Sequence, residues 1–243
     1  MKIIDDFQKY IQITTQRLSP IKYKLLIYLL FIFCVAAALY GIQIEFESRY
    51  VADDAFQLFA NTSIILNLTH PFSPGIYFSS FVHQVGDNHA HLYGNIQTYL
   101  IFAIMVFIIW ILRTVWDIPL PDKYFRYTYL SIFLIAPFCI SLFVMFGATY
   151  TFISPETCRG FSGITYAIVG VFIAQLFLLL QKLCHWNTWK EHAIFIILGI
   201  LFGILYPFYD IVYVGQPGNF FGHMGGCIVG FLISYFMELR LTK

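Results

Sequence analysis

The chain has 243 residues, of which 59% are hydrophobic, 20% aromatic and only 11% charged. This composition excludes an ordinary soluble domain and indicates a protein that lies in a membrane. A formal net charge of +1 gives no basic surface for nucleic acid, and five scattered cysteines form neither a disulfide framework nor a zinc motif.

The chain begins with a polar segment, residues 1–22, which precedes the first apolar run. That run, Tyr23 to Ile44, is long enough to cross a bilayer once at a rise of 1.5 Å per residue. It follows a long polar lead-in and lacks a convincing cleavage site, so we expect an anchor rather than a signal peptide. Residues 45–90 are interrupted by Pro71 and Pro74, and we expect a long loop that lies partly at the membrane interface.

Five further apolar runs predict membrane crossings. Their expected bounds are Leu92–Leu112, Tyr127–Phe146, Phe161–Leu180, His192–Tyr209 and Phe220–Leu239. The His192–Tyr209 run is the shortest of them, and we expect it to end near Pro207. The predicted fold class is therefore an all-α membrane protein, a six-transmembrane-helix bundle over residues 23–240 with both termini on one side.

Lys and Arg are distributed unevenly between the two sides of this bundle. Twelve of the fourteen lie in the N-terminal segment together with Lys24 at the start of the first run, in the loops 113–126 and 181–192, and at the C-terminus. The alternate loops hold only Arg49 and Arg159. Because cytoplasmic loops carry the excess of Lys and Arg, we predict that segment 1–22 and the C-terminus are cytoplasmic.

Ser162 lies at the start of the fourth predicted crossing, in the sequence Gly160-Phe161-Ser162-Gly163. Its hydroxyl is expected just below the outer membrane surface, among residues of little bulk. A serine there is either a hydrogen-bonded helix hydroxyl where two helices pack closely or a functional group. A nucleophilic serine needs a neighbouring base, because its hydroxyl is almost wholly protonated at neutral pH.

His223 in the sixth predicted crossing is the candidate base, since titratable groups within membrane spans are costly and often functional. Two faces of small residues suggest that its helix packs closely on that of Ser162. These faces are Gly222, Gly226 and Gly230 in the sixth crossing, and Gly163, Ala167 and Gly170 in the fourth. We therefore expect Ser162 and His223 at similar depth and within hydrogen-bond reach. Tyr166 would stack on the imidazole. The alternatives are interhelical packing for Tyr166 and a capping or hydrogen-bonded helix histidine for His223.

His91 and Asn95 open the second predicted crossing and, four residues apart, share one helix face. Hydrolysis of an amide places negative charge on the carbonyl oxygen, and one Asn-type donor aimed at that charge contributes about 3 kcal/mol. The alternative for this region is a metal site that includes His83, His89 and Asp87. No further carboxylate or cysteine nearby completes such a set, so we expect no metal.

Taken together, these residues resemble the rhomboid family of intramembrane serine proteases. Three motifs match in the family's order over residues 20–240. They are GxSG at Gly160, Ser162 and Gly163, followed by Tyr166, Ala167 and Gly170; HxxGxxxG at His223, Gly226 and Gly230; and HxxxN at His91 and Asn95.

The resemblance implies a six-helix bundle with a water-accessible cavity open to the outer side. Ser162 would be the nucleophile and His223 the general base, with no acidic third member. His91, Asn95 and the Ser162 backbone N–H would form the oxyanion site. The substrates would be single-pass transmembrane proteins cut near the outer end of their span. No cofactor or metal would be needed, and the protein would lie in a plasma or inner membrane with the site facing outward.

Two other functions stay open. A non-catalytic protein of the same fold would bind transmembrane clients, but such proteins typically lack the serine or the histidine that this chain retains. A small transporter would use the intramembrane histidines as a proton relay. Against the transporter stand the absence of an internal repeat and of acidic residues within the predicted crossings, apart from Asp210 and Glu238 near their ends.

Overall fold

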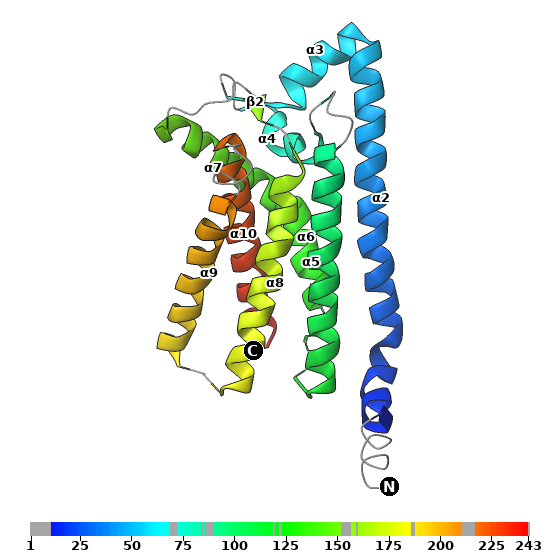
Figure 1. Cartoon of the computed structure of the whole chain (residues 1–243), viewed down its shortest axis with the longest axis vertical. Helices are drawn as coiled ribbons and strands as arrows, with labels where there is room; N and C mark the ends of the chain where they lie inside the picture. The colour runs from blue at the N-terminus through cyan, green and yellow to red at the C-terminus, as the bar shows by residue number, and fades with distance from the viewer. Residues whose placement is uncertain are drawn as a thin grey trace.

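The computed structural model describes residues 11–68, 72–83, 85, 90–118, 120–121, 123–151, 157–158, 160–185, 188–209 and 217–242. Asp87, His89, Arg159 and Asp210, considered above, lie outside these ranges. The described part is almost wholly helical, with long helices side by side and short elements gathered at one end (Figure 1).

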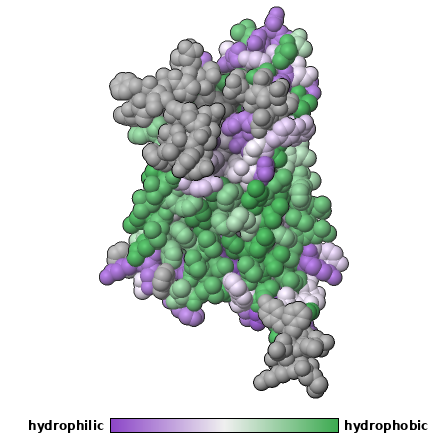
Figure 2. All heavy atoms as spheres, in the orientation of Figure 1, coloured by the Kyte–Doolittle hydropathy of each residue, from purple (hydrophilic) through white to green (hydrophobic). Residues whose placement is uncertain are grey.

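Five described helices are long and apolar enough to cross a membrane, and a bent pair of shorter helices would make a sixth crossing. The five are α2 (Lys22–Ala52), α5 (Ala90–Val115), α8 (Ser162–Leu183), α9 (Trp189–Tyr209) and α10 (Pro217–Leu241). On the face in Figure 2 an apolar belt lies between more polar ends. The protein is therefore a multi-pass integral membrane protein. In Figure 1, α2 begins and α10 ends at the same end of the bundle.

α2 is longer than the sequence predicts and contacts the bundle along one stripe. It continues beyond the expected end at Ile44 as far as Ala52. Its buried residues recur every three or four positions, as expected for a helix with one face against a core. They are Tyr28, Ile32, Ala36, Leu39, Gln43 and Phe46. Asp53 then ends α2 and caps α3 (Asp54–Ser63), accepting the N–H groups of Ala55 and Phe56 at 2.9 and 3.1 Å.

The predicted continuous crossing Tyr127–Phe146 is wrong in one respect, because it consists of two helices. α6 (Tyr124–Leu134) and α7 (Ala136–Thr151) meet at a 43° bend. Pro137 explains the break: proline lacks an N–H group and clashes with the carbonyl four residues earlier. That carbonyl belongs to Phe133 and accepts instead the hydroxyl of Tyr77, 2.8 Å away.

The segment predicted as a loop, residues 45–90, contains ordered short elements that contact the start of α8. After α3 come β1 (Leu66–Asn67), α4 (Gly75–Phe78) and the 3₁₀ helix η2 (Ser79–Phe81). β1 pairs antiparallel with β2 (Thr157–Cys158), and the Ser79 carbonyl accepts the N–H of Gly160 at 3.0 Å. The segment therefore fixes the chain immediately before Ser162.

α8 is the central helix of the bundle. Within its membrane-crossing stretch 78% of the residues are buried, against 22–44% for the other four crossings. Large apolar side chains on the outer helices are exposed, among them Phe33 on α2 and Leu198 and Leu205 on α9. This arrangement suits a lipid environment, in which apolar side chains can face outward.

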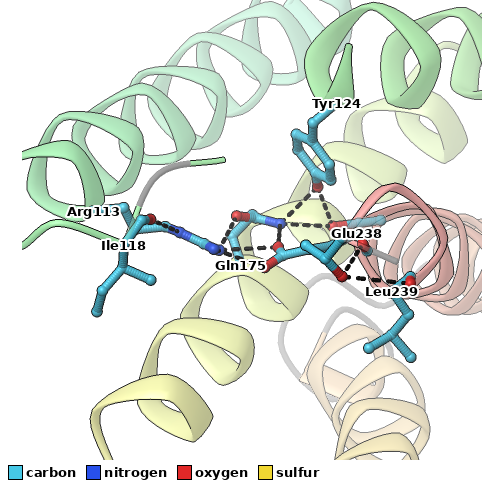
Figure 3. A network of polar contacts seen from close by, with 8 residues as sticks. Arg113, Ile118, Tyr124, Gln175, Glu238 and Leu239 are labelled. Carbon is cyan, nitrogen blue, oxygen red and sulfur yellow. Dashed lines mark hydrogen bonds and ion pairs between the residues drawn. The ribbon is translucent and has the colours of Figure 1, made fainter. Parts of the chain in front are cut away.

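A buried polar network joins four helices through Arg113 of α5 (Figure 3). The Arg113 guanidinium donates to both carboxylate oxygens of Glu238 in α10 at 2.7 and 2.9 Å. It also donates to the Gln175 side-chain oxygen of α8 at 2.9 Å. The Gln175 amide in turn donates to the Tyr124 hydroxyl of α6 at 2.7 Å. Arg113 and Glu238 are both about 1% exposed, so the charges are removed from solvent as a pair.

Candidate active site

α8 and α10 approach so closely that their glycines have no room for a side chain. A Cβ atom on Gly226 would lie 2.1 Å from the Gly163 carbonyl oxygen. A Cβ atom on Gly230 would lie 1.9 Å from the Ala167 carbonyl oxygen. On the other helix, a Cβ atom on Gly170 would lie 2.1 Å from the Cys227 carbonyl oxygen. The predicted close packing of the two small-residue faces is therefore confirmed.

Ser162 is the first residue of α8 and is 7% exposed. Gly160 sets the direction from which the chain enters the helix. Its backbone angle φ is +147°, a value that residues other than glycine rarely adopt. Phe161 is buried and packs edge to face against Tyr99 of α5. In the first turn of a helix the N–H groups have no acceptor within the helix, and the helix dipole is positive there. The Ser162 hydroxyl therefore lies at a place suited to a negative charge.

A small cavity of about 20 Å³ lies beside Ser162. Four serines from three parts of the chain contribute to its lining: Ser79, Ser80, Ser141 and Ser162. A cavity needs about 10–15 Å³ and two or more polar partners to hold a water molecule. The cavity next to Ser162 thus has the size and the hydroxyl groups to hold one water.

His223 lies on α10, 6% exposed, and its ring is held by Tyr166 of α8. The two ring centroids are 4.1 Å apart and the ring planes differ by 7°. The ring of Tyr206 in α9 also lies near Tyr166, with the two ring centroids 5.7 Å apart. The predicted stack between Tyr166 and His223 is therefore confirmed. Between the described residues Ser162 and His223 no hydrogen bond is found, so their direct contact stays a prediction. The contact of α8 with α10 and the stack on Tyr166 are what place the two residues.

The structure separates the environments of Asn95 and His91, which the sequence assigns to one face. Asn95 is buried, 8% exposed, and its backbone carbonyl accepts the Thr165 hydroxyl of α8 at 3.3 Å. His91 is exposed, with its ring centroid 5.0 Å from that of His83. Asn95 thus faces α8, one turn from Ser162, while His91 lies at the edge of the group. The donor role of both residues stays a prediction.

His83 is the residue that sequence reasoning placed elsewhere, as a candidate metal ligand. It is 2% exposed and follows η2. Its Nδ1 accepts the N–H of Phe161 at 3.3 Å, and its Nε2 lies 2.7 Å from the side-chain amide nitrogen Nδ2 of Asn95. The site therefore contains a buried imidazole between Asn95 and the residue before Ser162. No local motif marks His83, because both partners are distant in sequence.

Gln43 of α2 is a second residue that sequence reasoning missed. Its side-chain oxygen accepts the backbone N–H of His83 at 2.7 Å, and its amide donates to the His83 carbonyl at 3.5 Å. Gln43 is 1% exposed. The signal that could have found it is a polar side chain near the end of an apolar crossing.

Metal binding was the alternative interpretation of the histidines. Within the part of the chain that the structure describes, no three His, Cys, Asp or Glu side chains are grouped so as to hold a metal ion. His89 and Asp87 lie outside that part.

The chain was also compared with known proteins. No protein-family model, no curated protein and no solved structure matches it.

Proposed function

We propose that this protein is an intramembrane serine endopeptidase of the rhomboid type, with Ser162 as nucleophile and His223 as general base. The observation that carries the proposal is the pairing of two helix ends. Gly163 and Gly226 bring the helices into backbone contact, and Tyr166, one turn after Ser162, stacks on the His223 ring. Glycine contacts alone join many membrane helices; what supports the proposal is that here they join the helix that begins at Ser162 to the helix that carries a buried, stacked imidazole.

In the proposed reaction, the Ser162 Oγ attacks the carbonyl carbon of a substrate peptide bond while its proton passes to His223. The tetrahedral intermediate carries its negative charge on the former carbonyl oxygen. When it collapses, the C–N bond breaks and His223 donates the proton to the leaving amine. Water then attacks the acyl-enzyme ester with His223 as base, which releases the acid and restores Ser162.

The developing oxyanion would be stabilised at the start of α8. The Ser162 N–H lies in the first helical turn, where the helix dipole favours negative charge. Asn95 from α5 supplies a side-chain amide, and His91 remains the third proposed donor at the edge of the group. Together such donors are the largest single contribution in most acyl-transfer sites.

The substrates would be single-pass transmembrane proteins whose span unwinds near its outer end. Small helix-weakening residues there would let an extended backbone reach Ser162, which is buried at the start of α8 beside the 3₁₀ helix η2. We propose that this end of the bundle faces outward and that both termini are cytoplasmic, on the basis of the uneven distribution of Lys and Arg.

The experiment that tests the activity combines cleavage with covalent labelling. The purified protein, reconstituted in liposomes, is incubated with a single-span reporter and, separately, with a fluorophosphonate, which phosphonylates activated serines with loss of fluoride. We expect cleavage and labelling by the parent and by the control Ser131→Ala, whose serine lies on α6. Ser162→Ala and His223→Ala should each abolish both, and the double variant should be no worse than either single one.

Two outcomes contradict the proposal. Cleavage at the parent rate by Ser162→Ala would exclude the serine mechanism. A parent that neither cleaves nor is labelled, but that co-purifies with single-span proteins, would instead support the client-binding function.

The orientation is tested separately with reporter fusions. Fusions after residues 120 and 186 should report the cytoplasm, and a fusion near residue 75 should report the outside. A cytoplasmic signal at residue 75 would overturn the proposed placement of the site.

A further inference from the structure

We infer that His83 is a positioning residue that turns the Asn95 side chain so that its NH₂ group is available to the oxyanion. This inference rests on the proposed function. It starts from the surroundings of the His83 ring, which is almost completely buried and has a defined neighbour at each nitrogen: the Phe161 N–H at Nδ1 and the Asn95 amide at Nε2.

The Phe161 contact fixes the tautomer of His83. A backbone N–H can only donate, so Nδ1 must accept and cannot carry a proton. A neutral imidazole with an unprotonated Nδ1 carries its proton on Nε2. Nε2–H is therefore a donor, directed at the Asn95 amide 2.7 Å away.

The tautomer in turn fixes the orientation of Asn95. Two donors cannot share a hydrogen bond, so the Asn95 atom that contacts Nε2 must be its carbonyl oxygen. The structure places Nδ2 at this position. The oxygen and nitrogen of an Asn amide are assigned from their hydrogen bonds, so we exchange the two here, which leaves every heavy-atom position unchanged. With the oxygen held by His83, both N–H bonds of Asn95 point away from the imidazole.

His83 lies close enough to Ser162 for this orientation to matter. The space beside Gly160 borders both residues: a Cβ atom there would lie 3.5 Å from the Ser162 hydroxyl oxygen and 3.8 Å from the His83 Cε1 atom. The backbone of His83 is held on both sides by Gln43. One rigid unit therefore connects α2, the start of α8 and the Asn95 amide.

The first test measures the tautomer and does not depend on proteolysis. The full-length protein with ¹⁵N-labelled histidine is studied by solid-state NMR in liposomes near pH 7, and His83→Gln identifies the His83 signals. We expect a neutral ring protonated on Nε2. A ring protonated on Nδ1, or on both nitrogens, would overturn the inference whether or not the protein is a protease.

The second test measures whether His83 acts through Asn95. His83→Leu removes both ring contacts, whereas His83→Gln keeps an amide N–H that can donate to the Asn95 oxygen. We expect His83→Leu to lower kcat by up to about 10²-fold with KM little changed, and His83→Gln to restore most of the rate.

The same variants are then made in the Asn95→Ala background. There we expect His83→Leu to cause no further loss, because the amide it orients is gone. An equal loss from His83→Leu with and without Asn95 would overturn the inference. Fluorophosphonate labelling of Ser162 in each variant shows whether a loss of rate comes from a protein that has not folded. Labelling of the parent tests the proposed function itself.

Discussion

The ring of Tyr166 lies flat against the ring of His223, 4.1 Å away and only 7° from parallel. The two residues lie on helices that contact through glycine, and this close approach of α8 and α10 brings the two rings face to face. An imidazole stacked in this way keeps its two nitrogen atoms in a plane almost parallel to the Tyr166 ring. The stack therefore orients the proposed base in the place of an acidic third residue.

Two substitutions of Tyr166 should distinguish the contribution of its ring stack to catalysis from that of its hydroxyl group. Tyr166→Phe keeps an aromatic face, and we expect kcat within about twofold of the parent. Tyr166→Leu loses an aromatic contact of about 0.5–1.5 kcal/mol and frees the imidazole, so we expect kcat to fall about tenfold at unchanged KM. Equal rates for Tyr166→Leu and Tyr166→Phe, measured with the reporter substrate, would contradict an orienting role.

Asn95→Ala tests the oxyanion assignment. We expect kcat to fall by about 10²-fold with little change in KM, since the two other proposed donors, the Ser162 N–H and His91, remain. A purely structural amide would instead cost about 1–2 kcal/mol of stability and impair catalysis only through unfolding. Melting temperature and turnover measured on one preparation distinguish the two. Parent-like turnover in a stable variant would remove Asn95 from the site.

Gly226→Ala tests the contact between α8 and α10. The new methyl would collide with the Gly163 carbonyl, so we expect a loss of about 1–3 kcal/mol in the free energy of unfolding and a large fall in activity. The matched control is Gly41→Ala in α2, where a Cβ atom meets nothing within 4 Å. The control should leave stability equal or slightly higher, because alanine is the better helix former. Denaturant titration in micelles measures both, and equal stabilities would refute the close contact.

The Arg113–Glu238 pair should be essential for stability but not for chemistry. Glu238→Ala leaves a buried guanidinium without its carboxylate, at a cost of about 3–5 kcal/mol. Replacing both partners, as Arg113→Met with Glu238→Leu, should recover most of that loss. The exposed pair Glu45–Arg49 is the control, and Glu45→Ala should hardly change the melting temperature. Equal melting temperatures for Glu238→Ala and Glu45→Ala would show that burial of the pair is unimportant.

The sequence predicts well those features that depend on nearby residues. Apolar length gives the crossings, and glycine spacing gives the contact between α8 and α10 together with the stack of Tyr166 on His223. The bend at Ile135 was missed although Pro137 was visible, because hydropathy continues across it. The Phe133 carbonyl, which loses its helical hydrogen bond at the break, accepts the hydroxyl of Tyr77, a residue far away in sequence.

The part of the site that could not be predicted depends on such distant pairs. His83 contacts Asn95 and Phe161 across 12 and 78 positions. Its backbone is held by Gln43 of α2, and its neighbour Val82 packs with Phe46, Ala60 and Ile65, within a segment that composition describes only as a broken interfacial loop. Spacing rules apply within one helix, so they could place Asn95 on a face but could not identify the imidazole opposite it.

The bonds from Gln43 to His83 give the first helix a role beyond anchoring. A polypeptide that began after residue 44 would retain every residue of the three motifs and still lack both bonds that hold the buried imidazole. Such a fragment would resemble a hydrolase by its sequence and be deficient in rate. A separate peptide with the sequence of α2 would then raise the rate of the fragment, as an activating subunit does. In the intact protein this activator is part of the same chain.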